Sequence, residues 1–180
     1  MKTARDFVDL PRPELARILR EGHPVDPGAI ADFVYRGTSL GIPAWVERLA
    51  WKVFAKVFES DPETGHVRGW NLRIRQQGLD GPLEPLRKNG REITFGHFRV
   101  VSCEGYDMPV KTRGVLLDYG LGGNGALDPT SRVRDPIVAL TPGSADVLLG
   151  WTYLDLGFAR IGTPSYFLLE RYAPLQTARP

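Results

Sequence analysis

The last third of the chain, from Val110 to Tyr172, contains four closely spaced apolar stretches and no helical periodicity. Each stretch is rich in Val, Leu, Ile, Tyr or Trp and is bounded by Gly, Pro, Asn or Asp, which is typical of strands. The four are Val110–Tyr119, Pro136–Thr141, Val147–Leu156 and Ser165–Tyr172. Strands this close together, with no helical crossovers between them, must pair mostly antiparallel and form a barrel or a sandwich.

Four more strands are predicted upstream, which brings the expected total to about eight. They are Asp32–Ser39, a strand that ends at Phe58, Val67–Gln76 and Ile93–Ser102. The third of these has the clearest alternation, with Trp70, Leu72 and Ile74 on one face and polar residues on the other. Asn89-Gly90, just before the last of them, is a strong hairpin signal.

Helices are expected only near the N-terminus. Pro13 opens a short amphipathic helix that presents Leu15, Ile18 and Leu19 on one side and stops at Gly22. A turn-like piece follows at Pro27–Ala31, and a second helix is predicted from Pro43 to about Ala50. We therefore expect one domain over 1–180, with a helical lead-in at 1–31, a β-barrel at 32–172 and a flexible tail at 173–180.

Composition excludes several classes of protein. The net charge is only +2 and no basic run exceeds two residues, so we expect no nucleic-acid partner. No run approaches the roughly 18 apolar residues of a spanning helix, so we expect no membrane partner. The N-terminal residues lack the apolar core of a secretory signal, which predicts a cytoplasmic protein. The single Cys103 excludes an internal disulfide and a multi-cysteine zinc site, and we interpret it as a partly buried small residue.

Three short stretches resemble a bacterial family of unknown function that is named for its G-x-W-x-G motif. Phe33–Ser39 is similar to that motif, with Phe33 in place of the first Gly and Tyr35 in place of Trp. Phe54–Phe58 resembles the Gly-Lys-x-Phe element that follows it, with Ala in place of Gly, and Tyr166–Arg171 resembles the closing strand. The resemblance implies a lipocalin-like antiparallel barrel that holds a ligand, and it implies no catalytic residues.

The segment Gly120–Asp135 is a long stretch rich in Gly and Pro between two predicted strands. Its first six residues match G-x-G-x-x-G, the spacing of a dinucleotide-binding turn. That turn must open a helix, whereas Asp128-Pro129 follows here with no amphipathic pattern behind it. We therefore predict a flexible lid over the mouth of a barrel.

Candidate catalytic groups are few. The histidines are scattered and form no paired ligand motif, so no metal site is expected. His97 alternates with Phe95 and Arg99 within a strand, where it is either exposed or a general base inside the barrel. Asp118, Asp155 and Glu170 lie within apolar strands, so they are either paired on the outer face or act as ligand-orienting acids.

The expected function is the binding of a small hydrophobic molecule inside the barrel, without a cofactor. The predicted ligand-binding residues are aromatic side chains of the strands together with a cationic anchor, Arg99 or Arg113. The aromatic set is Trp70, Tyr119, Trp151, Tyr153 and Tyr166. The alternatives are a cofactor-free cyclase or isomerase acting on a lipid- or polyketide-like substrate, and a protein-interaction domain that uses the loop face. We also consider that the chain associates with a second copy of itself as a homodimer.

Overall fold

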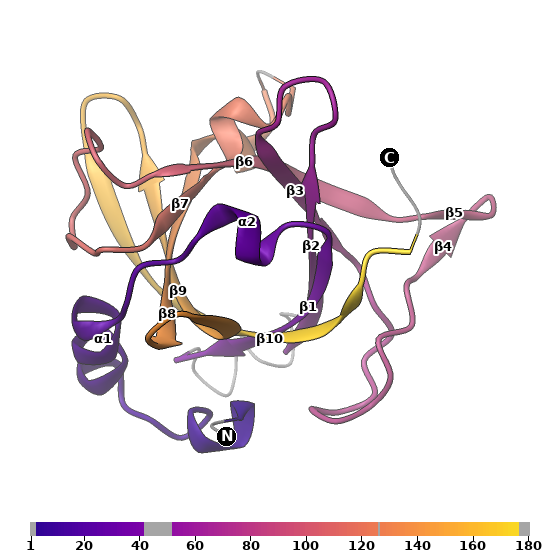
Figure 1. The fold of residues 1–180 in the computed structure, drawn as a ribbon, viewed down its shortest axis with the longest axis horizontal. Helices are drawn as coiled ribbons and strands as arrows, with labels where there is room; N and C mark the ends of the chain where they lie inside the picture. The colour runs from indigo at the N-terminus through magenta and orange to yellow at the C-terminus, as the bar shows by residue number, and fades with distance from the viewer. Residues whose placement is uncertain (1–2, 42–51, 126, 177–180) are drawn as a thin grey trace.

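Eight antiparallel strands close into a barrel in the computed structural model, which describes residues 3–41, 52–125 and 127–176 (Figure 1). Consecutive barrel strands pair with each other along the chain, and β1 and β10 pair to close the ring. The predicted mainly-β fold with an eight-stranded antiparallel barrel is thus confirmed. The strands are β1 (Phe33–Leu40), β2 (Val53–Ser60), β3 (Val67–Leu72), β6 (Thr94–Ser102), β7 (Val115–Asp118), β8 (Val133–Thr141), β9 (Ser144–Asp155) and β10 (Arg160–Pro174).

Several strand ends differ from the predicted ones. β7 begins at Val115 and not at Val110, because its ladder with β6 and β8 starts where Val115 meets Ser102 and Ile137. β10 is longer at both ends than predicted, since its partners β1 and β9 extend alongside it. Local composition therefore located the strands, while the partner strands set their lengths. The helix predicted from Pro43 to about Ala50 lies outside the described residues.

The interior of the barrel is recognised by a cluster of buried side chains that draws on all eight strands. Only the inner face of a closed sheet can bring such a set together, because successive side chains point to opposite faces. One residue from each strand in turn shows this: Tyr35, Phe58, Val67, Phe98, Val115, Ile137, Leu148 and Phe167. We call this set and the residues packed with it the interior cluster.

Two further clusters cover the outside of the barrel. The N-terminal cluster packs Phe7, Leu15 and Leu19 onto outward-facing residues of β7 to β10. The β2–β3 outer cluster packs Val57 and Trp70 beneath the segment that contains Leu79 and Leu83. Both faces of several strands are therefore buried, which removes the simple contrast between an apolar inner face and a polar outer face.

Two helices flank the barrel, and one of them closes an end of it. α1 (Arg12–Glu21) lies on the outside and buries Leu15 and Leu19, as its periodicity predicted. α2 (Pro27–Ile30) lies across the barrel opening that faces the viewer in Figure 1 and inserts Ile30 into the interior cluster. Among the described residues, no helix is long and apolar enough to cross a membrane.

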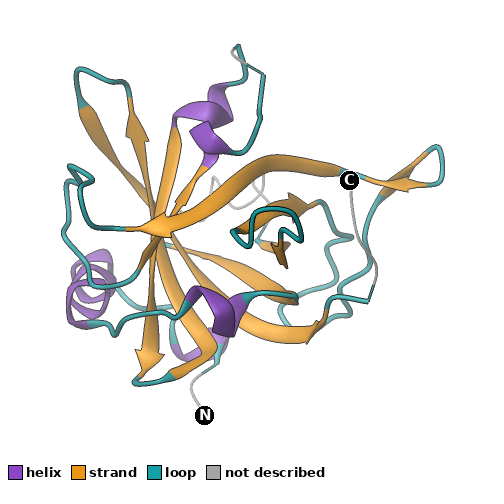
Figure 2. Cartoon of the chain, turned by 45° about the horizontal axis from the view of Figure 1, so that its top comes forward, coloured by secondary structure: helices purple, strands orange, loops and turns teal. Residues whose placement is uncertain are grey.

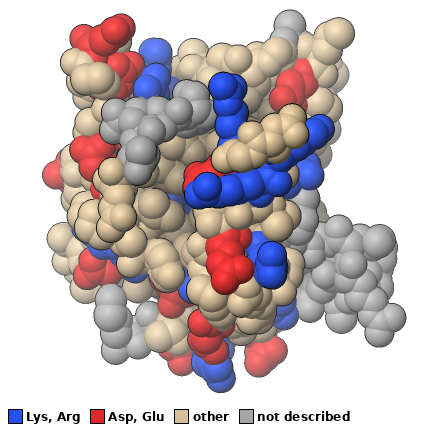
Figure 3. All heavy atoms as spheres, turned by 90° about the vertical axis from the view of Figure 1, so that its right-hand side faces the viewer, with Lys and Arg blue, Asp and Glu red and all other residues tan. Residues whose placement is uncertain are grey.

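A short hairpin projects from the barrel between β3 and β6 (Figure 2). It consists of β4 (Arg87–Lys88) and β5 (Arg91–Glu92), joined by Asn89-Gly90 with φ values of 53° and 79°. The hairpin signal is therefore confirmed, since both turn residues adopt the positive φ that such a turn requires. Figure 3 looks onto the side from which this hairpin projects, where basic side chains gather with acidic ones beside them.

Candidate functional site

A lysine lies inside the barrel. Lys56 alternates on β2 with Phe54 and Phe58, and Phe58 belongs to the interior cluster. The period of the strand therefore turns the Lys56 side chain inward, where its exposed fraction is 1%. A buried ammonium group is costly unless it is paired, so its partners define the site.

Lys56 shares a hydrogen-bonded group with a tyrosine and an aspartate from distant parts of the chain. Its Nζ donates to Tyr119 Oη at 2.7 Å and lies 3.5 Å from Asp135 Oδ2. Tyr119 Oη donates in turn to the same Asp135 oxygen at 2.8 Å. One amine, one phenol and one carboxylate thus meet within the interior of the barrel.

Two neutral side chains complete the group. Thr152 donates from Oγ1 to Asp135 Oδ1 at 2.8 Å. Asn71 donates from Nδ2 to the carbonyl oxygen of Gly96 at 3.1 Å and lies 3.5 Å from Tyr119 Oη. We call these five side chains the polar cluster: Lys56, Asn71, Tyr119, Asp135 and Thr152.

Aromatic rings surround the amine. The Lys56 Nζ lies 4.8 Å from the ring centroid of Phe98 and 5.3 Å from those of Tyr119 and Phe167. The ring of Phe54 is 5.8 Å away. Ring faces at such distances attract a cation and exclude water from it.

Interior glycines make room for three of the phenylalanine rings. Each ring lies over the glycine directly opposite it on the next strand, where a Cβ atom would come within 2.1–2.5 Å of the ring. The pairs are Gly37 with Phe54, Gly69 with Phe98, and Gly150 with Phe167. These glycines therefore build the aromatic surroundings of Lys56.

Burial changes the acidity of the two central groups in opposite directions. Desolvation lowers the pKa of Lys56 to about 8, although the charge of Asp135 opposes the change. Desolvation and the Asp135 carboxylate together raise the pKa of the Tyr119 phenol well above its ordinary value. Near neutral pH the site can therefore offer an amine that readily loses its proton beside a phenol that keeps its proton.

The glycine-rich segment after β7 holds Tyr119 in place. Tyr119 begins the 3-10 helix η2 (Tyr119–Leu121), and the carboxylate of Asp118 accepts from the Gly120 backbone at 2.8 Å. Asn124 then fastens the segment to β6, donating to the His97 carbonyl oxygen at 2.6 Å and accepting from its amide at 3.0 Å. Instead of lying free as the predicted lid would, this part of the segment is anchored to the barrel wall.

The polar cluster lies close to the end of the barrel opposite α2. At that end, Phe54 and Val133 pack against the interior cluster but remain partly exposed, and Thr152 is also partly exposed. Thr152 contacts Asp135 directly, and Asp135 contacts Tyr119. A partly exposed residue is therefore two hydrogen bonds away from the centre of the site.

The predicted ligand-binding residues are distributed over both faces of the barrel. Tyr119 lies in the interior, whereas Trp151, Tyr153 and Tyr166 lie together in the N-terminal cluster on the outside. Trp70 lies in the β2–β3 outer cluster. These four aromatic residues therefore differ from the interior lining that we expected, because their strands are buried on both faces and composition does not distinguish the two.

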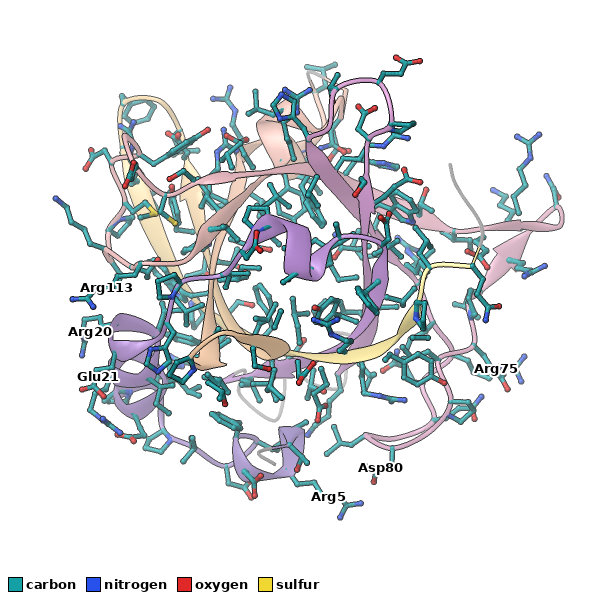
Figure 4. All side chains as sticks on the ribbon, viewed as in Figure 1. Arg5, Arg20, Glu21, Arg75, Asp80 and Arg113 are labelled. Atoms are coloured by element: carbon teal, nitrogen blue, oxygen red, sulfur yellow. The ribbon has the colours of Figure 1, made fainter. Side chains whose placement is uncertain are left out.

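The two predicted cationic anchors also lie away from the polar cluster. Arg99 is opposite Asp118 in the β6–β7 ladder and alternates with the inward-facing Phe98 and Val100, which places it on the outer face. Arg113 is exposed and points away from the barrel (Figure 4). Neither arginine meets the polar cluster in this structure.

The four predicted catalytic candidates lie outside the interior as well. His97 stacks on Trp70 with a centroid distance of 6.2 Å, and burial lowers the pKa of His97. Asp118 pairs with Arg134 at 3.2 Å and accepts from Tyr106 Oη at 2.9 Å.

The other two acidic candidates, Asp155 and Glu170, also have partners within the protein. Asp155 lies 3.5 Å from Arg160, and Glu170 accepts from the Ala4 amide at 3.2 Å. Among the described residues, no three His, Cys, Asp or Glu side chains converge as a metal-binding group would require.

Four members of the polar cluster were missed by sequence reasoning. Lys56 was not among the predicted site residues, because Val53, Ala55 and Val57 form an apolar alternation to which Lys56 does not belong. The signal that was present is the pair of phenylalanines two residues to either side of Lys56, which places a cation between two large apolar side chains. Asn71, Asp135 and Thr152 carry no such local signal.

Comparison of the chain with protein-family models, with curated proteins and with solved structures found no match.

Proposed function

We propose that the barrel binds one small, mainly apolar molecule, which enters from the end opposite α2 and is anchored by the polar cluster. The observation that carries this proposal is the convergence of five polar side chains inside an otherwise apolar barrel, next to its partly exposed end. Ligand sites have this composition, with many apolar and aromatic side chains and a few convergent polar groups. Barrels of about eight strands are wide enough to hold one small ligand.

Stability alone is a poor explanation of the polar cluster. Replacing a buried ion pair by apolar residues of similar volume is often neutral or stabilising. A barrel that needed only a core would be at least as stable with apolar side chains at Lys56 and Asp135. Their burial therefore favours a role in recognition.

The polar cluster indicates what the ligand must carry. A protonated Lys56 has three N–H donors, and two oxygen atoms lie near its Nζ among the described residues. The amine therefore has one donor left for an acceptor on the ligand. The surrounding rings favour an apolar body, so the ligand we expect is a hydrophobic molecule with a carbonyl or similar acceptor group.

The resemblance to the G-x-W-x-G family supports the same proposal. The three stretches that carry it belong to β1, β2 and β10, and β1 pairs with both of the others. Lys56 lies in the middle stretch, at the lysine of the Gly-Lys-x-Phe element. The resembling residues thus form one continuous part of the wall that includes the amine of the site.

A second candidate function is acid–base catalysis on the same kind of molecule, as in a cofactor-free cyclase or isomerase. The observation that favours it is the lowered pKa of Lys56 beside a phenol and a carboxylate. An amine with a pKa near the working pH can abstract a proton, and the phenol can donate one. The position of the reacting bond above the amine would then decide the product.

Native mass spectrometry of the purified chain tests the proposal first, since a tightly held molecule would be retained in the gas phase. The retained molecule is then incubated with the protein: unchanged recovery supports binding, and conversion to an isomer or cyclised product supports catalysis. Titration with the fluorescent probe 1-anilinonaphthalene-8-sulfonate gives a second readout that needs no natural ligand.

Tyr119→Phe and Tyr153→Phe form a matched pair for this titration. Both tyrosines are buried, but Tyr119 belongs to the polar cluster and Tyr153 to the N-terminal cluster outside. We expect Tyr119→Phe to weaken the affinity for the probe and for the retained molecule about tenfold, which corresponds to about 1.4 kcal/mol. Tyr153→Phe should leave it unchanged. No retained molecule, together with equal probe affinity in both variants, would contradict the proposal.

A further inference from the structure

Lys56 has the surroundings of a reactive amine. Its Nζ is buried among four aromatic rings, and its hydrogen-bond partner Tyr119 is itself held by Asp135. Desolvated lysines in apolar sites are the ones that form covalent adducts with carbonyl compounds. Among the described residues, the other lysines are partly exposed at Lys52 and exposed at Lys88 and Lys111.

We propose that Lys56 forms a reversible imine with an aldehyde or ketone carbonyl of the bound molecule. This inference rests on the proposed binding function and specifies the chemical class of the ligand. The carbonyl group that would accept a hydrogen bond from the remaining N–H of Lys56 is then the same group that the amine attacks.

The reaction balances with the groups that are present. The neutral Lys56 amine adds to the carbonyl carbon, and the carbonyl oxygen becomes the hydroxyl of a carbinolamine. Loss of that hydroxyl as water, with the amine proton, leaves a C=N bond between Nζ and the ligand. No oxidant or reductant is consumed.

Tyr119 and Asp135 provide the proton transfers that this sequence needs. Tyr119 Oη is 2.7 Å from the nitrogen, so it can donate a proton to the departing hydroxyl. Asp135 Oδ2 lies 3.5 Å from Nζ and 2.8 Å from Tyr119 Oη, so it can take up the proton that the amine releases and return one to the phenol. The burial that lowers the pKa of Lys56 also supplies the neutral amine near pH 8.

Reductive trapping tests the inference on the full chain. The protein is incubated with 2-naphthaldehyde and sodium cyanoborohydride at pH 8, and adducts are located by peptide mass spectrometry. The chain has five lysines, so the adduct on each lysine can be quantified separately. We expect the adduct on Lys56 to form at least about tenfold faster than on any other lysine, because an ordinary lysine with a pKa of about 10.4 is almost fully protonated at this pH.

Variants separate the role of the site from that of lysines in general. Lys56→Met should abolish the preferred adduct, whereas Lys52→Met, four residues earlier in the chain, should retain it. Tyr119→Phe should slow trapping about tenfold, and Tyr153→Phe should not. If Lys56→Met does not fold, the distribution of adducts in the unaltered chain decides the question alone.

The hydrocarbon 2-methylnaphthalene distinguishes failure of this inference from failure of the proposed function. It has the shape of the aldehyde without a carbonyl, and its binding is measured by displacement of 1-anilinonaphthalene-8-sulfonate. If both naphthalenes displace the probe but adducts show no preference for Lys56, the imine is excluded and binding stands. If neither displaces the probe and no preferred adduct forms, the proposed function fails together with the imine.

Discussion

The burial of Lys56 imposes a cost that its partners offset only in part. Desolvation disfavours the charged amine, while Tyr119, Asp135 and the surrounding ring faces favour it. Desolvation is the larger effect, so the folded protein holds the Lys56 proton less tightly than the unfolded chain does. This difference links the free energy of unfolding to pH.

We expect Lys56 to destabilise the protein below pH 8 relative to an apolar residue, and this effect to disappear between pH 8 and about pH 10.5. In that range the unfolded chain binds more protons at this site than the folded protein, so the stability contributed by the site rises with pH. The unfolding free energy of the wild type, relative to that of Lys56→Met, should therefore rise by roughly 3 kcal/mol across the range. Urea denaturation at a series of pH values measures it.

Two comparisons make the pH experiment specific. Lys111→Met changes an exposed lysine and should show a difference that does not vary in this way. Above pH 10 the wild type and Lys56→Met should both lose stability. Burial raises the pKa of Tyr119, and raises that of Tyr35 to about 12, so these phenols lose their protons more readily in the unfolded chain. A Lys56 difference that stayed flat between pH 8 and 10 would mean that the interior holds the ammonium as well as water does.

At the scale of elements, the connection from β7 to β8 positions a site residue instead of covering the site. Its two short 3-10 helices, η2 and η3 (Pro129–Arg132), are capped by Asp118 and Asp128. Asn124 bridges the connection to His97 on β6. The glycines are required where the chain passes close to β6, and at Gly122 a Cβ atom would come within 1.9 Å of the His97 carbonyl oxygen.

Gly122→Ala should therefore displace the connection and weaken the protein by about 1–3 kcal/mol. Gly125→Ala is the matched control, since no atom lies within 4 Å of the position that its Cβ would take. Chemical denaturation gives the stabilities, and amide hydrogen exchange at His97 reports whether the bond to Asn124 survives. Equal stability of the two variants would show that the connection moves freely after all, as a lid would.

The segment that follows β3 covers the outer face of β2 and β3. Leu79 and Leu83 pack against the β2–β3 outer cluster, in which the outward-facing Trp70 has an exposed fraction of only 5%. Trp70→Ala should cost about 3–5 kcal/mol in unfolding free energy. Phe158→Ala, at a side chain that is 88% exposed, should cost less than about 0.5 kcal/mol in the same denaturation experiment. A loss below about 1 kcal/mol for Trp70→Ala would mean that this outer cover contributes little.

At the scale of the whole molecule, the barrel is packed on both surfaces of its wall. The interior cluster reaches from Ile30 of α2 to Tyr119 of the polar cluster, and the two outer clusters cover much of the outside. The Tyr35 hydroxyl donates to the Ala145 carbonyl oxygen at 2.8 Å, and Arg171 donates to the Ala29 carbonyl oxygen at 2.8 Å. These bonds fasten the end that α2 closes, so the polar cluster faces the end through which we propose that a ligand enters.

The amino-acid sequence alone determined the class of fold, the number of barrel strands, the face of α1 that is buried and the Asn89-Gly90 hairpin. All of these depend on local periodicity or turn chemistry, which neighbouring residues in the chain decide.

The site itself was decided by tertiary structure. Lys56, Tyr119 and Asp135 are far apart in the chain, and only closure of the barrel brings them within hydrogen-bonding distance. The inner and outer faces could not be told apart from the sequence, because outer clusters bury Trp70 and Trp151 as deeply as the interior buries its own residues. The alternation of a strand shows which residues share a face, and only the packing of the whole chain determines which of the two faces points inward.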